Sequence, residues 1–256
     1  MAHNMDKTKL LFACDLDRTL IHSAKRRKEG DVCVEWLDGK ELSFMGTKAR
    51  SLVKGLMQNL LLVPVTTRSI AQYLRIQWQE GAAPRYAAAA NGAILLENGV
   101  PLADWLRESE ASAAPYMEEM DKLREIIAED KDILYSKLID GMYVFCPCAD
   151  EVTAERKRNE YAEKTSLLSF ASGRKLYFLP PCFTKGAALR RLRERFSPSR
   201  CIAAGDSVID VSMLEEADGA FCPPELRPLV HSRIPPAIPP EGKDFTEFFL
   251  AQISSM

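Results

Sequence analysis

Two aspartates one residue apart, Asp15 and Asp17, follow a short apolar run at residues 10–14. A continuous apolar run of this length is typical of a strand that is buried on both faces of a sheet. In an extended segment, alternate side chains point to the same side, so both carboxylates would face one direction. Two like charges held this close repel each other, and each resists ionising beside the other. The pair therefore indicates a site where a cation, or a reaction that needs both groups, offsets this cost.

Further polar residues stand where other predicted elements end or begin. Thr66 closes a second apolar run, and Asp206 and Asp210 follow a third. Lys185 begins a predicted helix. Each has a structural alternative when taken alone: a strand-end hydroxyl, a helix cap or a solvated lysine. Because ligands of open α/β sheets bind at the carboxyl ends of the strands, their joint placement predicts one site.

The chemistry of these residue types is consistent with phosphoryl transfer. Asp15, Asp17 and Asp206 offer the hard oxygen ligands that Mg²⁺ prefers. One carboxylate can attack phosphorus and form an aspartyl-phosphate, while its neighbour protonates the leaving oxygen and later deprotonates water. The hydroxyl of Thr66 and the ammonium of Lys185 would hold the charged phosphoryl oxygens.

The order of predicted elements changes along the chain. Strands and helices alternate in residues 1–100 and again in 181–256, as in an open α/β fold. Residues 101–180 instead combine hairpins with helices, which indicates an inserted α+β unit with an antiparallel sheet. The predicted strands are 10–14, 32–36, 41–44, 60–65, 86–90, 93–96, 100–102, 133–138, 142–146, 167–171, 175–179, 200–204 and 220–222. The predicted helices are 47–60, 69–78, 113–129, 152–164, 185–196, 211–217 and 245–253.

Composition bounds the class of protein. The chain has 256 residues, 46% of them hydrophobic and 27% charged, which suits a globular protein with a sizeable core. A net charge of −2 gives no electrostatic reason to expect nucleic acid or an anionic membrane as a partner. The sequence has no apolar run long enough to span a bilayer and no signal-peptide pattern at its start. The seven cysteines are scattered, Cys146 and Cys148 lack a second pair for a zinc site, and free thiols in the cytoplasm are expected.

Four segments resemble, in order, the motifs of the haloacid dehalogenase superfamily. These segments are Asp15-Leu16-Asp17-Arg18-Thr19, Thr66-Thr67-Arg68, Lys185-Gly186 and Gly205-Asp206-Ser207-Val208-Ile209-Asp210. The segments 90–93 and 176–180 resemble the Cof-type branch, which includes sucrose-phosphatase-like and mannosyl-3-phosphoglycerate-phosphatase-like enzymes. The resemblance implies a Rossmann-like parallel-sheet core with a type IIB α/β cap inserted between the second and third motifs.

The resemblance also implies roles at the matching positions. Asp15 would be the nucleophile and a metal ligand. Asp17 would be the general acid/base, with its backbone carbonyl on the metal. Thr66 and Lys185 would bind the phosphate.

The remaining positions concern the metal and the substrate. Asp206 would bind Mg²⁺, and Asp210 would either ligate through water or hold the motif-three lysine. Thr67, Arg68 and Asn91 are possible substrate contacts, although Asn91 is also a plain turn residue.

Two positions depart from the family pattern. Arg18 stands where this branch usually has Gly, and Ile209 stands where Asn is common. Neither change removes a metal or phosphate ligand, so they bear on substrate and rate more than on reaction class.

The sequence thus predicts a Mg²⁺-dependent phosphatase that acts on a small phosphorylated metabolite, with a sugar phosphate as the expected substrate. A phosphotransferase or phosphomutase would use the same intermediate. A non-catalytic phospho-ligand sensor is the alternative from another class, but binding alone needs no general acid beside the nucleophile.

Overall fold

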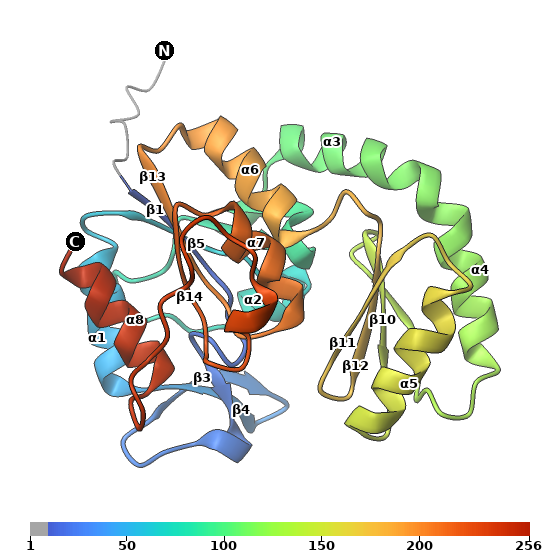
Figure 1. The fold of residues 1–256 in the computed structure, drawn as a ribbon, viewed down its shortest axis with the longest axis horizontal. Helices are drawn as coiled ribbons and strands as arrows, with labels where there is room; N and C mark the ends of the chain where they lie inside the picture. Colours follow the sequence, from blue (N-terminus) through green and yellow to red (C-terminus); the bar gives the residue numbers. More distant parts are fainter. Residues whose placement is uncertain (1–9) are drawn as a thin grey trace.

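A parallel sheet forms the centre of the computed structural model, which describes residues 10–256. Its strands, in spatial order, are β14 (Gly219–Phe221), β13 (Arg200–Ala204), β1 (Leu10–Cys14) and β5 (Leu61–Pro64). Cys14 pairs with Ala204 on one side and with Pro64 on the other. The carboxyl ends of β13, β1 and β5 therefore lie at one edge of the sheet (Figure 1).

Helices cover both faces of this sheet. One face is covered by α1 (Thr47–Leu56) and α8 (Phe245–Ser254), the other by α6 (Lys185–Phe196) and α7 (Val211–Glu216). Alternate residues of β1 serve the two faces: Phe12 contacts Phe249, with ring centroids 5.8 Å apart, whereas Leu11 packs in the cluster that contains Leu189. A strand whose two faces are both covered by helices has to be apolar throughout, as this sequence is.

Two small antiparallel sheets extend this core. The first, called the flap sheet below, contains β2 (His22–Ser23), β4 (Lys40–Met45) and β3 (Val32–Leu37), and the short 3₁₀ turn η1 (Ala24–Arg26) follows β2. The second contains β6 (Tyr86–Ala89), β7 (Ile94–Glu97) and β8 (Val100–Pro101). A parallel bridge between Val65 and Ala88 joins the second sheet to the end of β5.

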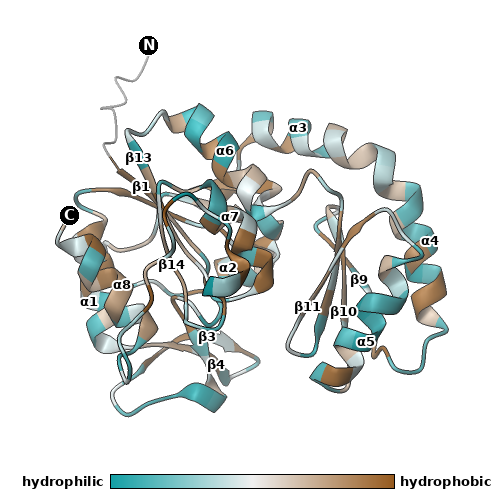
Figure 2. Cartoon of the chain, in the orientation of Figure 1, coloured by the Kyte–Doolittle hydropathy of each residue, from teal (hydrophilic) through white to brown (hydrophobic). Residues whose placement is uncertain are grey.

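The chain then enters an α+β unit, the cap. Its sheet, the cap sheet, has the order β11 (Leu168–Ser172), β12 (Lys175–Leu179), β10 (Tyr143–Pro147) and β9 (Lys137–Ile139). The helices α4 (Met117–Ala128) and α5 (Glu151–Ala162) cover one face and share an apolar cluster with it. Figure 2 shows the cap strands on one side of α4 and α5, and the visible surface of α5 is largely hydrophilic. The fold is therefore an α/β core with an inserted α+β cap, as the sequence predicts.

The main error in the predicted elements concerns the entry to the cap. One helix was expected over 113–129, but the structure has α3 (Ala103–Ala113) and, after the turn η3 (Ala114–Tyr116), α4. The only large buried side chain of α3 is Trp105, beside the small Ser109 and Ala113, so its apolar pattern is too weak to predict a helix.

The second helix after the flap is also shorter than expected. α2 (Ile70–Leu74) was expected to reach residue 78. The chain leaves the helix because Gln77 donates its backbone N–H to the carbonyl of Val34 in the flap sheet, at 2.7 Å. The predicted strand 133–138 was placed too early, because β9 covers Lys137–Ile139 and Ile133 forms only an isolated bridge with Cys148. The other predicted helices and strands are confirmed, with boundary shifts of a few residues.

In residues 10–256, no helix combines the length and the apolar character needed to cross a membrane.

Candidate active site

Adjacent strand ends bring the predicted residues together. The backbone N–H of Asp15 donates to the carbonyl of Ala204 at 2.9 Å, and that of Val65 donates to the carbonyl of Cys14 at 2.8 Å. The ends of β1, β5 and β13 are thereby held in register, one or two residues before the polar side chains begin. The site is thus built on sheet hydrogen bonds and not on loop packing.

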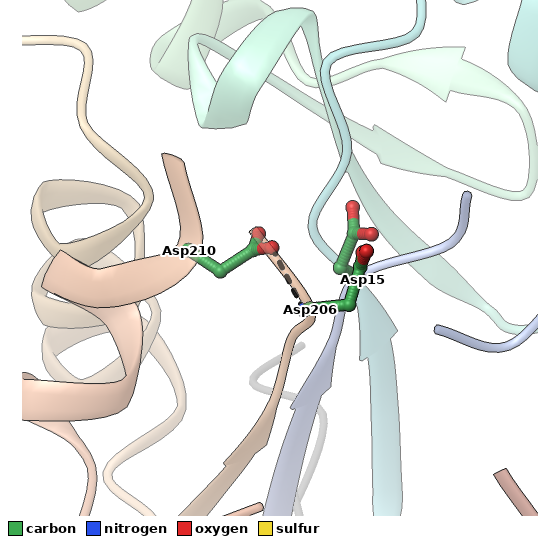
Figure 3. A group of neighbouring side chains, drawn as sticks. All are labelled: Asp15, Asp206 and Asp210. Carbon is green, nitrogen blue, oxygen red and sulfur yellow. Dashed lines mark hydrogen bonds between the residues drawn. The ribbon is translucent and has the colours of Figure 1, made fainter. Parts of the chain in front are cut away.

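Three carboxylates meet at this edge: Asp15, Asp206 and Asp210 (Figure 3). One oxygen from each lies within 4.8 Å of the others. Burial raises the pKa of Asp15 well above its usual value, and the negative charges of Asp210 and Asp206 add to the effect. Burial, followed by the charge of Asp210, raises the pKa of Asp206 to about 6. The cluster concentrates negative charge in a site that is largely out of water.

Lys185 supplies the compensating positive charge. Its Nζ lies 2.5 Å from Oδ1 of Asp15 and 2.6 Å from Oδ1 of Asp210, and the residue is 1% exposed. Burial alone would lower the pKa of this ammonium, but the two carboxylates outweigh it and raise the pKa. Thr184 caps the helix that begins at Lys185 by accepting the N–H of Ala187. The lysine is therefore held charged, at a fixed helix start.

Asp210 serves mainly as an acceptor for its neighbours. Its Oδ2 accepts hydrogen bonds from the backbone N–H of Asp206 at 3.1 Å and from both the N–H and the hydroxyl of Ser207 at 2.9 Å. Gly205 allows this contact, because a Cβ there would lie 2.4 Å from Cβ of Asp210. Asp210 thus ties Lys185 to the turn that carries Asp206.

Asp17 points to a different partner from Asp15. The guanidinium of Arg68 donates from Nε to Oδ2 and from Nη2 to Oδ1 of Asp17, each at 2.8 Å. Burial alone would raise the pKa of Asp17, but the hydrogen bonds and charge of Arg68 outweigh it and lower the pKa. Asp17 is therefore held ionised.

A buried glutamate of the flap sheet completes this arrangement. Glu35 accepts Nη1 of Arg68 at 2.9 Å, Nη2 of Arg75 at 2.8 Å and the hydroxyl of Ser43 at 2.6 Å. Burial would raise the pKa of Glu35, but the hydroxyl and the guanidinium groups lower it. Nothing in the sequence pattern singled out this glutamate. The only feature of the sequence that could have indicated Glu35 is its charge within an otherwise apolar predicted strand.

The other sequence candidates occupy distinct places. Thr66 is fully buried and accepts the backbone N–H of Arg68 at 3.2 Å. Thr67 lines the cleft described below, and its carbonyl accepts a hydrogen bond from the hydroxyl of Tyr143 in the cap. Asn91 is 1% exposed, donates to the carbonyl of Phe183 at 2.7 Å and lies outside the cleft lining.

The two departures from the family pattern both line the cleft. Arg18 has φ of 71°, in the left-handed region that favours glycine, and its Nε lies 3.0 Å from Oδ2 of Asp206. Thr19 donates its hydroxyl to the other oxygen of Asp206 at 3.2 Å. Ile209 offers only a hydrocarbon side chain at the rim.

The site opens into a cleft between the core and the cap. The cleft has a main chamber of about 620 Å³, which contains Asp15, Lys185 and Asp206, and a side arm of about 350 Å³. Asp17, Thr67, Tyr135, Phe145, Lys175 and Tyr177 line both parts. Arg26, from the basic run after β2, also lines the main chamber. The sequence offers one signal for the cap residues that face the cleft, which is the period-two alternation of side chains along the cap strands.

The carboxylate cluster fits a hard divalent cation. Asp15, Asp206 and Asp210 offer oxygen donors, and Mg²⁺ prefers oxygen donors. Oδ2 of Asp206 is buried and, despite its proximity to Arg18, accepts no aligned hydrogen bond. A buried carboxylate oxygen whose cationic neighbour is the poorly aligned guanidinium of Arg18 is costly, and a bound cation would relieve that cost.

The arrangement is that of a haloacid dehalogenase-type fold with a cap. A haloacid dehalogenase-like hydrolase from B. subtilis has a similar structure, with 16% identity, coverage of 83% of this chain and 88% of the other, and a TM-score of 0.52. No protein-family model matches this sequence, and no curated protein sequence does.

Two solved structures of sugar-phosphate phosphatases are also similar to this protein over nearly the whole length of the chain. Sucrose-phosphatase from Synechocystis, solved with sucrose and phosphate, shares 19% identity, with 96% and 97% of the two chains covered and a TM-score of 0.62. The C-terminal domain of trehalose-6-phosphate phosphatase from C. albicans shares 14% identity, with 98% and 93% covered and a TM-score of 0.59. At these sequence identities the similarity establishes the fold and not the activity.

Proposed function

We propose that this protein is a Mg²⁺-dependent phosphatase that hydrolyses a small phosphorylated metabolite through an aspartyl-phosphate on Asp15. One observation carries the proposal. The carboxylate of Asp15 lies within a cluster that holds a fixed ammonium, Lys185, and a carboxylate oxygen of Asp206 without an aligned donor. The similarity of the fold to sucrose-phosphatase and trehalose-6-phosphate phosphatase supports a sugar phosphate as the substrate.

In the first step, a carboxylate oxygen of Asp15 attacks phosphorus and the bond from phosphorus to the ester oxygen breaks. Asp17 gives its proton to that departing oxygen, which leaves as an alcohol. The ammonium of Lys185 offsets the charge on the phosphoryl oxygens, and the hydroxyl of Thr66 donates a hydrogen bond to one of them. Mg²⁺, held by Asp15, Asp206 and the carbonyl of Asp17 with Asp210 behind them, would supply a Lewis acid for these oxygens.

In the second step, water attacks the aspartyl-phosphate and Asp17 takes the proton of that water. Inorganic phosphate leaves, and the carboxylate of Asp15 is restored. The pair with Arg68 holds Asp17 ionised, which suits the base role. For the acid role, this pair has to loosen as the substrate enters, so that Asp17 can carry a proton.

The test is the substitution Asp15→Asn, assayed for phosphate release from a panel of phosphorylated metabolites with and without Mg²⁺. We expect a loss of at least about a thousandfold in kcat, the order seen when a nucleophile is removed. The circular dichroism spectrum should be unchanged. Asp38→Asn is the matched control, because Asp38 lies in the exposed turn of the flap hairpin, away from the cleft. Full activity in Asp15→Asn would rule out the mechanism.

A phosphotransferase or phosphomutase would form the same intermediate. Adding acceptor alcohols to the assay distinguishes them, because a transferase releases a new phosphate ester in place of inorganic phosphate.

We also propose the chain division expected from the sequence: a core of residues 1–100 and 181–256 and a cap of 101–180. The first boundary falls later than residue 101, because the start of α3 packs on the core: the guanidinium carbon of Arg191 lies 3.7 Å from the ring centroid of Trp105. A cytoplasmic location is part of the proposal. All seven cysteines are free thiols, which persist in a reducing compartment.

A further inference from the structure

Several of the side chains that line the side arm of the cleft have no role in the proposed chemistry. Its volume is about 350 Å³, and it adjoins Asp17 on the side away from Asp15 and Lys185, which do not line it. The flap sheet, α2 with the residues beside its two ends, and the cap sheet form its walls. A group carried by the leaving part of the substrate would enter this space.

The wall from the cap follows from strand alternation. In β12, Lys175 and Tyr177 face the cleft, whereas Leu176 and Phe178 pack into the cap's own apolar cluster. In β10, Phe145 faces the cleft in the same way, and its ring centroid lies 5.5 Å from that of Tyr177. The cap therefore presents an aromatic surface to the cleft, bordered by lysine.

Lys137 of β9 lies on the same face, directly opposite Phe145 in the neighbouring strand. Its Nζ is 5.2 Å from the ring centroid of Tyr135. Two lysines, Lys137 and Lys175, thus border one aromatic surface from both sides. Both are exposed to the cleft and belong to a rigid sheet.

The charges of the side arm do not balance. Its lining has four cationic side chains, which are Arg68, Arg75, Lys137 and Lys175, and two carboxylates, which are Asp17 and Glu35. Both arginines are paired with those carboxylates. Neither lysine has a carboxylate within 4.0 Å among the described residues. One wall of this partly enclosed space therefore carries two ammonium groups that touch no carboxylate of residues 10–256, although the charge of Lys175 also helps to lower the pKa of Asp17.

We propose that the side arm binds a second anionic group, a carboxylate or a phosphate, carried by the leaving part of the substrate. The carbon skeleton between the two anionic groups lies against Phe145 and Tyr177. Lys175 lines both parts of the cleft and marks the passage between them. This inference rests on the proposed phosphatase function and narrows its substrates to doubly anionic phosphate esters.

The test compares esters that differ in one anionic group. Glycerol 3-phosphate is paired with 3-phosphoglycerate, and fructose 6-phosphate with fructose 1,6-bisphosphate. We expect kcat/KM of the wild-type protein to be higher for the second member of at least one pair. The carboxylate pair and the phosphate pair separate the two kinds of anion.

The lysines are then replaced singly, as Lys137→Met and Lys175→Met. Each substitution should lower kcat/KM for the favoured anionic ester by about tenfold, the loss expected for one charge-assisted hydrogen bond, and reduce the preference within the pair. Lys131→Met is the matched control: this exposed cap lysine lines neither part of the cleft, so the preference should stay unchanged. Equal rates within both pairs, or a preference that survives both substitutions, would overturn the inference.

Binding measurements separate the test of the anion site from the test of the proposed phosphatase function. Calorimetry with 3-phosphoglycerate and fructose 1,6-bisphosphate is run on Asp15→Asn, alone and combined with Lys137→Met or Lys175→Met. Lysine-dependent binding without any turnover by the wild-type protein supports the anion site and contradicts the phosphatase. Turnover without lysine-dependent preference or binding supports the phosphatase and overturns the anion site. Absence of both binding and turnover overturns both.

Discussion

Arg68 holds Asp17 through two parallel hydrogen bonds of 2.8 Å, and its third nitrogen binds the buried Glu35. The residue proposed to move protons is thereby linked to the flap sheet through one planar guanidinium. A lysine has a single nitrogen and cannot reproduce this fork geometry. Arg68 thus positions Asp17 in addition to facing the cleft.

The substitution Arg68→Lys tests this positioning. We expect kcat to fall by about ten- to a hundredfold, the range for a misplaced general acid/base. KM should change less, because the phosphoryl ligands are untouched. Steady-state kinetics with the best ester of the panel measure both. Arg107→Lys, on the exposed side of α3, is the control and should behave as wild type. An unchanged kcat in Arg68→Lys would show that Asp17 does not need the two parallel hydrogen bonds from Arg68.

Glu35 gives a prediction for stability against pH. Its pKa in the folded protein is lowered below the ordinary value of 4.5, so the unfolded chain binds the proton first as the pH falls. Its contribution is complete above the unfolded value and is lost as the pH falls through the folded pKa. Glu35→Gln should lower the free energy of unfolding by about 3 kcal/mol at neutral pH, the cost of breaking a buried ion pair.

Urea denaturation of wild type and Glu35→Gln between neutral and acidic pH measures this effect. The difference in unfolding free energy between the two proteins should shrink as the pH is lowered below 4.5. A difference that stays constant over this range would show that the carboxylate charge contributes nothing.

Arg18 gives a prediction for cation binding. Its guanidinium lies 3.0 Å from the buried oxygen of Asp206 that would face a metal ion. Two cations beside one carboxylate compete. Arg18→Gly, which also suits the left-handed backbone there, should tighten Mg²⁺ binding by about two- to fivefold, the scale of a partly exposed ion pair.

The rise in melting temperature with Mg²⁺ concentration measures this affinity without any substrate. Asp206→Asn is the control and should abolish the rise. Weaker Mg²⁺ binding in Arg18→Gly would show that the guanidinium assists the cation and does not compete with it.

Gly205 gives a prediction for packing behind the carboxylates. A Cβ at this position would lie 2.4 Å from Cβ of Asp210, which holds Lys185. Gly205→Ala should destabilise the fold by about 1 to 3 kcal/mol through overpacking and also lower kcat, because Lys185 shifts with its partner.

Gly55→Ala provides the contrast. Gly55 lies in α1 with nothing within 4 Å of the added carbon. This substitution should stabilise the protein by about 0.5 to 1 kcal/mol, as helix propensity predicts, and leave kcat unchanged. Thermal melts and steady-state rates of the two variants measure both effects. Wild-type activity in Gly205→Ala would contradict the proposed link from Asp210 to Lys185.

Local pattern was sufficient to predict most elements of the core. The apolar runs that became β1, β5 and β13 end in Asp15, Thr66 and Asp206, and the order of such strands predicted the fold class. Local pattern failed at α3, whose burial depends on a few contacts with the core, including Trp105. A helix whose buried face carries one large apolar side chain and otherwise small residues leaves a weak periodic signal.

The sequence by itself determined which residue types stand at the strand ends, because the apolar runs and the carboxylates, hydroxyl and lysine that follow them are local features. Only the tertiary structure decided their partners. It pairs Lys185 with Asp15 and Asp210, Asp17 with Arg68, and Arg68 with Glu35. It also brings the lysines of the cap sheet to the cleft. These pairings join segments that are far apart in the chain. Packed layers, which no local pattern contains, bury Lys185, Arg68 and Glu35, and their charges therefore need these partners.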